Sequence, residues 1–327
     1  MVPETQRITL KDFRFHTGDV LPEISLHCTT WGNRQGQPVM LLHGTNGSAA
    51  GLVTPEWQQT LFGPGQPLDL SHHWVIVPDA LGCGRSTKPS DGLRAKFPNY
   101  NYADMVQAQH RLLTEGLGVQ HLRAIIGYSM GGMHTWLWAQ QHPGFMDLAV
   151  PMACMPTPIS GRNWMMRRMV IDAIRQDPEW QGGEYRRPLR SAHFALTYYA
   201  VATSGGTWGL FKSGPDQDKA NAWLDARMAQ APIADANDAL YQYEAARDYD
   251  ASVGLEHITA RVLAINNADD ERNPPELGVM EAAMKRLKNG RYVLLPLGPD
   301  SRGHGTTGNA RTWKQHLAEL LDKAPKR

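Results

Sequence analysis

The segment Gly127-Tyr-Ser-Met-Gly131 places Ser129 between two glycines at the spacing Gly-x-Ser-x-Gly. The mostly apolar residues before it, 122–126, predict a buried strand, and residues 133–142, which lack glycine and proline, predict a helix. A serine at such a turn is a nucleophile elbow, in which glycines allow strand and helix to approach closely. Without that context, a Gly-x-Ser-x-Gly in a chain with 31 glycines would indicate an ordinary turn. We therefore expect the Ser129 hydroxyl to attack an acyl carbon.

A serine hydroxyl needs a general base within hydrogen-bond reach and an acid that orients this base. Behind a nucleophile elbow these partners follow in the order Ser, Asp or Glu, His. His304 lies between glycines in the loop after the last predicted strand, and we expect it to be the base. Three adjacent acids follow the preceding predicted strand. Of these, Asp270 is the expected orienting acid, with Asp269 second and Glu271 third.

Acyl transfer also needs donors for the oxyanion of the tetrahedral intermediate. The backbone N–H of Met130, which follows the nucleophile, is one expected donor. The second should come from the glycine-rich loop His43–Gly47, and we predict the N–H of Thr45. His43 itself is interpreted as an anchor of this loop rather than as a proton shuttle.

The strands and helices that must position these residues are expected to alternate along the chain. Two alternating segments, 8–15 and 23–30, predict strands, and buried strands are expected at 38–43, 73–78, 122–126, 147–153, 260–266 and 291–296. Helices are expected at 102–116, 133–142, 275–288 and 309–321. Strands that alternate with helices predict an α/β fold with a mostly parallel central sheet. The loops that carry the serine, the acids and the histidine should then emerge at the same edge of the sheet.

The alternation of strands and helices stops over residues 156–254, which are rich in helix formers, tryptophan and methionine. We interpret this segment as an inserted helical cap, or lid, on a core formed by residues 1–155 and 255–327. Some of its large side chains could line an acyl pocket, and more of them are expected in the core of the cap. The pair Arg167–Arg168, and the pair Arg186–Arg187 together with Arg190, could bind a carboxylate or phosphate. We interpret both as solvated helix faces.

Composition excludes several other function classes. The formal net charge is +1, which argues against a nucleic-acid partner, and no apolar run is long enough to cross a membrane. The first residues lack the charged and apolar regions of a signal peptide, so the expectation is a cytoplasmic protein, although a removed leader would leave the same sequence. We expect no metal, because the 13 histidines show no ligand spacing. We also expect no cofactor. Three widely spaced cysteines are interpreted as structural: Cys28, Cys83 and Cys154.

Segments spread over nearly the whole chain share a further pattern: Gly63–Asp69, His73–Pro78, Leu81–Ser86, Ser129–Met133, Asp172–Tyr185 and Asp235–Asp250. They resemble the homoserine O-acetyltransferases of the α/β-hydrolase superfamily. The resemblance implies the α/β-hydrolase fold and a triad of Ser129, Asp270 and His304. Asp270 gains support because Asp-x-x-x-Pro-Pro-Glu, from Asp270 to Glu276, looks like the acid loop of that family.

The chain departs from the family's pattern at three places. It has His43–Gly47 where the transferases typically carry His-Ala-Leu-Thr-Gly, and Tyr198–Tyr199 where they usually carry Tyr-Arg. Gly305 follows the expected catalytic histidine, where the family has an acidic residue. A zwitterionic amino acid needs both a cation and a carboxylate when it is buried. The loss of both favours an acceptor other than homoserine.

These observations predict a serine hydrolase that cleaves a carboxylic ester through an acyl-enzyme on Ser129, with a small-molecule ester or acyl donor as its partner. The alternative is an O-acyltransferase that moves the acyl group of an acyl-CoA to an alcohol. Both share the acyl-enzyme and differ in what attacks it. A third, less favoured hypothesis is a non-catalytic binding protein with a hydrolase fold. A homodimer formed through the cap is compatible with the sequence.

Overall fold

Within residues 2–232 and 234–324, which the computed structural model describes, an eight-stranded sheet has the strand order β1-β2-β4-β3-β5-β6-β7-β8. The strands are β1 (Glu4–Arg14), β2 (Val20–Gly32), β3 (Gln37–Leu42), β4 (His73–Pro78), β5 (Leu122–Tyr128), β6 (Met146–Met152), β7 (Arg261–Asn267) and β8 (Gly290–Leu295). Strand β2 pairs antiparallel with β1 and β4, and all other neighbours pair parallel. The α/β architecture with a mostly parallel sheet, expected from the sequence, is confirmed.

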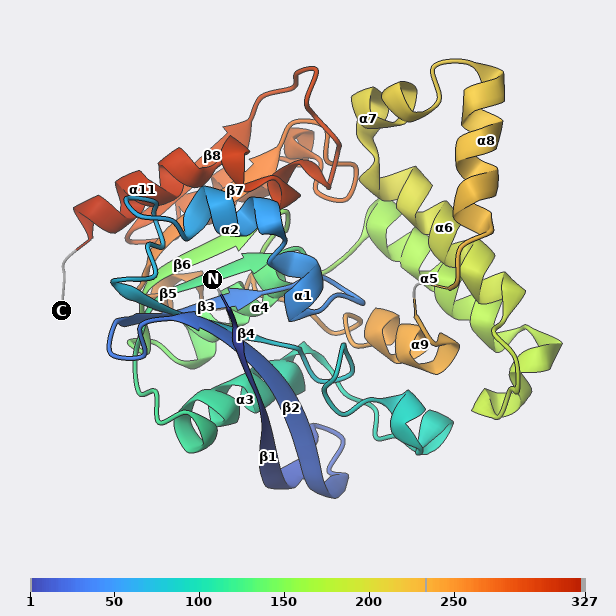
Figure 1. Ribbon diagram of the computed structural model, residues 1–327, viewed down its shortest axis with the longest axis horizontal. Coiled ribbons are helices and arrows are strands. Elements are labelled where there is room, and N and C mark those ends of the chain that lie inside the picture. Colours follow the sequence, from blue (N-terminus) through green and yellow to red (C-terminus); the bar gives the residue numbers. More distant parts are fainter. Residues whose placement is uncertain (1, 233, 325–327) are drawn as a thin grey trace.

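Helices cover both faces of this sheet (Figure 1). Buried side chains of α3 (Tyr102–Arg111), α4 (Met130–Gln141) and α10 (Val279–Met284) pack on one face. Those of α1 (Ala49–Leu52), α2 (Pro55–Leu61) and α11 (Lys314–Lys323) pack on the other. The parallel strands are therefore buried on both sides, which is why their sequences are almost continuously apolar.

Strand β3 shows how the two layers are formed. Successive side chains of a strand point to opposite faces of the sheet. Val39 and Leu41 accordingly belong to the cluster with α2 and α11, whereas Met40 and Leu42 belong to the cluster with α3 and α4. All four side chains are at most 2% exposed, so the end of β3 is held rigidly before the loop that begins at His43.

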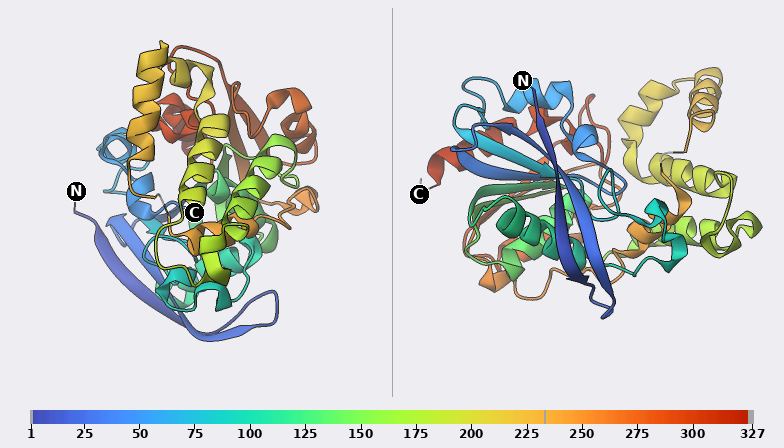
Figure 2. Two further views of the ribbon diagram at one scale, coloured as in Figure 1. Left: turned by 90° about the vertical axis from the view of Figure 1, so that its right-hand side faces the viewer. Right: turned by 60° about the horizontal axis from the view of Figure 1, so that its bottom comes forward.

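Helices α5 to α9 lie between β6 and β7 in the sequence, and we refer to them as the cap. Their bounds are α5 (Gly161–Arg175), α6 (Arg190–Ser204), α7 (Gly206–Ser213), α8 (Gln217–Met228) and α9 (Ala236–Glu244). The cap has a hydrophobic cluster of its own, which includes Ile171, Leu196 and Leu240. It lies beyond the carboxyl ends of the parallel strands, and the right-hand view of Figure 2 shows it projecting from the rest of the fold.

Two expected helices begin later than the sequence pattern predicts. The predicted helix 275–288 is α10, which begins only at Val279. Residues Pro275–Leu277 form a separate turn that ends at Gly278 in the left-handed conformation, with φ of 65°. Glycine adopts this conformation readily, and it interrupts a helix. Likewise, the predicted helix 309–321 is a short turn, Ala310–Thr312, followed by α11, because Trp313 between them has a φ of −132°, which is not helical.

Candidate active site

Ser129 lies at the junction of β5 and α4. Its backbone has φ of 55° and ψ of −113°, a left-handed conformation that is unfavourable for a non-glycine residue. The Ser129 N–H donates to the carbonyl of Met152 at 2.9 Å, and the Ser129 carbonyl accepts from the N–H of Met133 at 3.0 Å. Such a conformation costs about 1–3 kcal/mol and persists because the surrounding structure imposes it. The turn directs the hydroxyl away from the sheet and toward the histidine loop.

The two glycines of the elbow are required by close backbone packing. A Cβ atom on Gly127 would collide with the carbonyl of Gly131, and a Cβ atom on Gly131 would collide with the carbonyl of Leu42. Helix α4 thus crosses the ends of β3 and β5 with no room for a side chain at these positions. The spacing Gly-x-Ser-x-Gly is therefore a packing requirement as well as a sequence motif.

The structure brings the three residues of the predicted triad together. Nε2 of His304 lies 2.8 Å from Oγ of Ser129, and Nδ1 lies 2.9 Å and 3.1 Å from the two carboxylate oxygens of Asp270. Each of the three residues is at most 3% exposed. A carboxylate only accepts hydrogen bonds, so Nδ1 of His304 carries the proton and Nε2 can accept the proton of the serine hydroxyl.

The acid loop after β7 separates the roles of its three acids. Asp270 also accepts hydrogen bonds from the N–H of Arg272 and from Nδ2 of Asn273, both at 2.9 Å. Asp269 accepts instead from the N–H of Gly303 at 2.8 Å. Glu271 is half-buried, and in the described part of the chain neither it nor Asp269 hydrogen-bonds to His304.

The charges of the triad follow from burial and from these contacts. Burial lowers the pKa of His304 below its ordinary value; Asp270 opposes this shift, whereas Arg272 and Arg167 add to it. Burial alone would raise the pKa of Asp270, but the adjacent imidazole and the hydrogen bonds from Asn273 and Arg272 outweigh it, so the pKa is lowered. At neutral pH the pair is therefore a neutral imidazole and a carboxylate, the state that a general base requires.

The two predicted oxyanion donors come from two different elements. Met130 is the first residue of α4, so its N–H points out of the helix N-terminus. Thr45 is in the loop after β3, and this loop approaches the nucleophile so closely that a Cβ on Gly44 would lie 3.5 Å from Cβ of Ser129. Within the described ranges neither N–H donates to another residue, so both are free for a ligand.

His43 holds the loop after β3 in place. Its Nε2 accepts a hydrogen bond from the N–H of Ala80 at 3.0 Å, and Nδ1 lies 2.8 Å from the carbonyl of Gly44. Burial lowers the pKa of His43, so the ring stays neutral with its proton on Nδ1. Both ring nitrogens are engaged with backbone groups, as a loop anchor requires. A recess of about 240 Å³ beside this loop is lined by residues that include Thr45, Trp57 and Tyr128.

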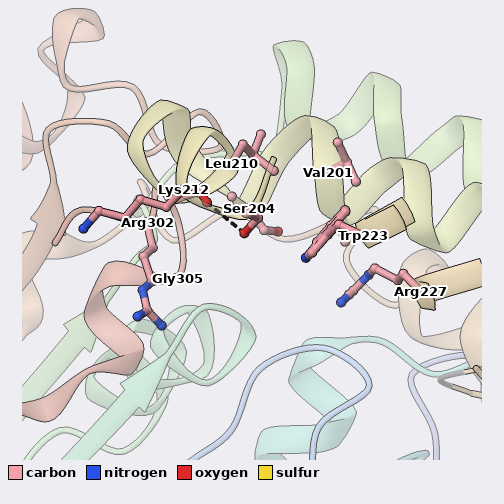
Figure 3. A pocket seen from close by; sticks show the side chains of 12 residues that line it. Val201, Ser204, Leu210, Lys212, Trp223, Arg227, Arg302 and Gly305 are labelled. Carbon is pink, nitrogen blue, oxygen red and sulfur yellow. Dashed lines mark hydrogen bonds between the residues drawn. The ribbon is translucent and has the colours of Figure 1, made fainter. Parts of the chain in front are cut away.

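A larger cavity of about 580 Å³ lies where the cap meets the histidine loop (Figure 3). Its wall includes Ser204, Trp223 and Gly305, and Gly305 is the residue after His304. The cationic side chains of Lys212, Arg227 and Arg302 also line it, and no acidic side chain is among its lining residues in the described chain. The cavity therefore offers an open, cationic space beside the histidine loop.

Arg167 was not recognised as a site residue from the sequence. The pair Arg167–Arg168 is expected from the sequence to form a solvated helix face. This is wrong for Arg167, which is 0% exposed. It holds for Arg168, which is exposed and forms an ion pair with Asp172 at 2.7 Å. The helical period contains the signal: the buried positions of α5 are 163, 167, 170, 171 and 174, a single stripe that includes the arginine. Residues Arg186, Arg187 and Arg190 are exposed, as expected.

Arg272, in the acid loop, is a second residue that sequence reasoning missed. Its guanidinium lies 4.4 Å from the centre of the Tyr199 ring on α6. Its Nε donates to Oγ1 of Thr203 at 3.0 Å, and Nη2 donates to Oγ of Ser204. Arg272 therefore connects the acid loop to the cap two residues after Asp270.

In the described part of the chain no group of three or more His, Cys, Asp or Glu residues is arranged to hold a metal ion. The three cysteines are free and buried, and burial raises the pKa of the Cys28 thiol to about 12 and those of Cys83 and Cys154 as well. None of them is therefore an activated thiolate. No helix of the described residues has the length and apolar character needed to cross a membrane.

Comparison with known proteins identifies the family of the chain. Residues 37–296 match the family described as alpha/beta hydrolase fold. The homoserine O-acetyltransferase of Pelobacter propionicus is 32% identical over 295 residues, which cover 79% of each chain. That of Methanohalophilus mahii is 34% identical over 201 residues, but these span only 41% of its length and 56% of this chain. A probable acyltransferase of Methanothermobacter thermautotrophicus is 28% identical over 84% of this chain and 85% of its own length.

Solved structures share the fold at lower identity. The acetyl esterase MekB superposes with a TM-score of 0.82 at 23% identity, covering 98% of this chain and 97% of that chain. The homoserine O-acetyltransferase from Bacillus anthracis superposes with a TM-score of 0.85 at 20% identity, covering 100% and 99%. Esterases and acyltransferases thus share this architecture. The chain belongs to the α/β-hydrolase family, and within it this protein is an enzyme of the homoserine O-acetyltransferase-like group.

Proposed function

We propose that this enzyme is a serine hydrolase that cleaves a carboxylic ester. The observation that carries the proposal is the hydrogen-bonded chain from Asp270 through His304 to Ser129. Its geometry matches what nucleophilic acyl transfer requires: a base within reach of the hydroxyl, and an acid that fixes the tautomer of the base.

In the first half of the reaction, Oγ of Ser129 attacks the acyl carbon while Nε2 of His304 takes the hydroxyl proton. The negative charge that develops on the acyl oxygen is stabilised by the free N–H groups of Met130 and Thr45. As the C–O bond to the alcohol breaks, the imidazolium returns its proton to the departing alkoxide. An acyl group then remains on Ser129, and the alcohol leaves.

In the second half, water attacks the acyl carbon and gives its proton to Nε2 of His304. The bond to Oγ of Ser129 breaks, the serine oxygen takes that proton back, and the carboxylic acid departs. The carboxylate of Asp270 stabilises the imidazolium in both halves without accepting its proton. The recess of about 240 Å³ beside Thr45 and Tyr128 has room for a short acyl group.

An O-acyltransferase is the second candidate, and the identity to named homoserine O-acetyltransferases favours it. In that reaction an alcohol replaces water in the second half. The surroundings of His304 support hydrolysis instead, because the next residue, Gly305, offers no carboxylate for an amino group. The hydroxyl of Tyr199, which stands where the transferases usually carry arginine, donates to Oδ1 of Asn163 at 3.0 Å and presents no charge.

The test compares p-nitrophenyl acetate turnover by the wild type, by Ser129→Ala and by Ser71→Ala, a control in an exposed loop at the opposite edge of the sheet. Acetyl-CoA with and without L-homoserine is assayed in parallel by release of free thiol. We expect ester turnover by the wild type and the control, loss of it in Ser129→Ala, and no homoserine-dependent thiol release. Homoserine-dependent release would establish the transferase, and turnover that survives in Ser129→Ala would exclude the proposed nucleophile.

A further inference from the structure

Arg167 is a fully buried cation without an anionic partner. It lies on α5 and is 0% exposed, and no acidic side chain of the described residues forms an ion pair with it. Its Nε donates to Oδ1 of Asn163 at 3.1 Å, and Nη2 lies 3.5 Å from Oγ1 of Thr45. Its Nη1 is buried and has no hydrogen-bond partner among the described residues.

The surroundings of Arg167 keep it charged but do not neutralise it. Burial acts to lower the pKa of Arg167, but the tyrosines around it, Tyr199, Tyr102 and Tyr243, hold the pKa above its ordinary value. The guanidinium lies 5.3 Å from the centre of the Tyr243 ring, a cation–π contact. A buried charge without a counter-ion is destabilising. An arrangement of this kind is complementary to an anion that arrives with a ligand.

The guanidinium also lies beside the reacting centre. Thr45, which it contacts, belongs to the loop that packs against the nucleophile, and the charge of Arg167 is one of the causes of the lowered pKa of His304. Through Asn163 it is linked to Tyr199, because Oδ1 of Asn163 accepts hydrogen bonds from both side chains. Helix α5 thus supplies a cation next to the position on α6 where this chain lacks one.

We propose that Arg167 binds a carboxylate of the substrate, so that the natural substrate is an ester carrying a free carboxylate in its acyl or its alcohol part. A carboxylate matches the planar fork of a guanidinium. In the described structure Nη1 of Arg167 has no partner within hydrogen-bond geometry, and Nη2 makes only a long contact. The inference rests on the proposed function, because that function places the reacting ester at Ser129. The expectation of a negative charge on the substrate rests on the burial of Arg167 and on its lack of an anionic partner among the described residues.

The first test uses matched substrates that differ in charge alone. For the alcohol part, 4-acetoxybutanoate is compared with 4-acetoxybutanamide. For the acyl part, the p-nitrophenyl monoester of glutaric acid is compared with the p-nitrophenyl ester of glutaramic acid, in which an amide replaces the carboxylate. The wild type should prefer the carboxylate in one pair by about 10-fold or more in kcat/KM, in line with hydrogen bonds to charged groups. Arg167→Met should abolish this preference, because it lowers kcat/KM for the charged ester more than for its neutral counterpart.

Two variants accompany this test. Arg168→Met removes the adjacent, exposed arginine and should leave the preference unchanged. Arg167→Lys keeps the charge but loses the fork, and should retain part of the preference even where the methionine variant does not fold. Equal loss of the charged and neutral substrates in both Arg167 variants, or no preference in the wild type, would overturn the inference and leave Arg167 as a structural residue.

A binding measurement separates this inference from the proposed function. Calorimetric titration of Ser129→Ala with 4-hydroxybutanoate and with monomethyl glutarate needs no turnover. We expect at least one of them to bind more tightly than its uncharged counterpart, butane-1,4-diol or dimethyl glutarate, and the difference to disappear when Arg167→Met is added. If binding depends on charge but the wild type hydrolyses no ester, the carboxylate site is supported and the hydrolase proposal fails. Charge-independent binding would overturn the site whatever the activity.

Discussion

Asp269 and Asp270 are adjacent in the sequence, yet their carboxylates hold two different groups of the histidine loop. Asp270 lies 2.9 Å from Nδ1 of His304, whereas Asp269 accepts the backbone N–H of Gly303 at 2.8 Å. One acid therefore faces the imidazole, and its neighbour supports the backbone immediately before it. This division of contacts makes the two carboxylates separable by mutation.

Asp270→Asn should reduce kcat for p-nitrophenyl acetate by about 10³ to 10⁴-fold, because an amide in place of the orienting carboxylate favours the wrong imidazole tautomer. Asp269→Asn should retain activity within about 10-fold, since the amide oxygen can still accept the N–H of Gly303. Steady-state kinetics of the two folded variants decide the point. Equal losses would mean that the two acids act as a unit and that Asp270 has no separate role.

The kcat/KM of the wild type should rise with pH and level off, with a midpoint below the ordinary imidazole value of about 6.5. The reason is that burial lowers the pKa of His304, and the neutral ring is the active form, so activity is lost only as the pH falls through that lowered pKa. Arg167→Met should move the midpoint upward, because the positive charge of Arg167 contributes to lowering it. A wild-type midpoint above 6.5 would contradict the electrostatic account of the site.

Gly131→Ala should destabilise the fold by about 1–3 kcal/mol or more, which is the usual cost of overpacking a tight site. The added Cβ would collide with the carbonyl of Leu42, which is part of β3 and cannot move away as a flexible side chain can. Gly51→Ala is the matched control, because a Cβ there meets only Oγ of Ser48 at an ordinary 3.5 Å. Urea unfolding of both variants gives the two free energies. Equal stability would show that the elbow glycine is not a packing requirement.

We also predict that the cap forms a homodimer interface. Met165 and Met169 on α5, and Phe194 and Tyr198 on α6, are 68%, 55%, 62% and 49% exposed although they are large and apolar. Each pair is spaced by one helical turn, and the two helices pack against each other, so the four side chains can form one patch. Patches of this kind typically mark an interaction site, and a two-fold dimer would cover it with its own copy.

Phe194→Glu should convert this dimer into a monomer, as measured by sedimentation equilibrium. Leu297→Glu, which alters an exposed leucine (58%) just after β8, is the control and should leave the dimer intact. A monomeric wild type, or a dimer that survives Phe194→Glu, would place the interface elsewhere or exclude it.

The limits of sequence reasoning appear most clearly in α10 and α5. Proline at the start of the predicted helix 275–288 is compatible with a first turn, but Gly278 adopts a left-handed conformation that ends this turn early. On α5, a charged residue suggested a solvated face, whereas the burial of Arg167 follows from how α5 packs on the tyrosines of α6 and α9. The first outcome depends on the backbone conformation of one glycine, and the second on contacts of α5 with helices that are distant in the sequence.

The sequence by itself determined the alternation of strands and helices, the serine elbow, and the order in which acid and base follow it. These features are local, since the side-chain period of a strand or helix and the glycines of a tight turn are written in consecutive residues. Only the tertiary structure decided that Asp270 rather than Asp269 touches His304, and that Arg167 is buried beside Thr45. Adjacent side chains in a loop differ in direction by the backbone torsions between them, and those torsions are set by packing across the whole fold.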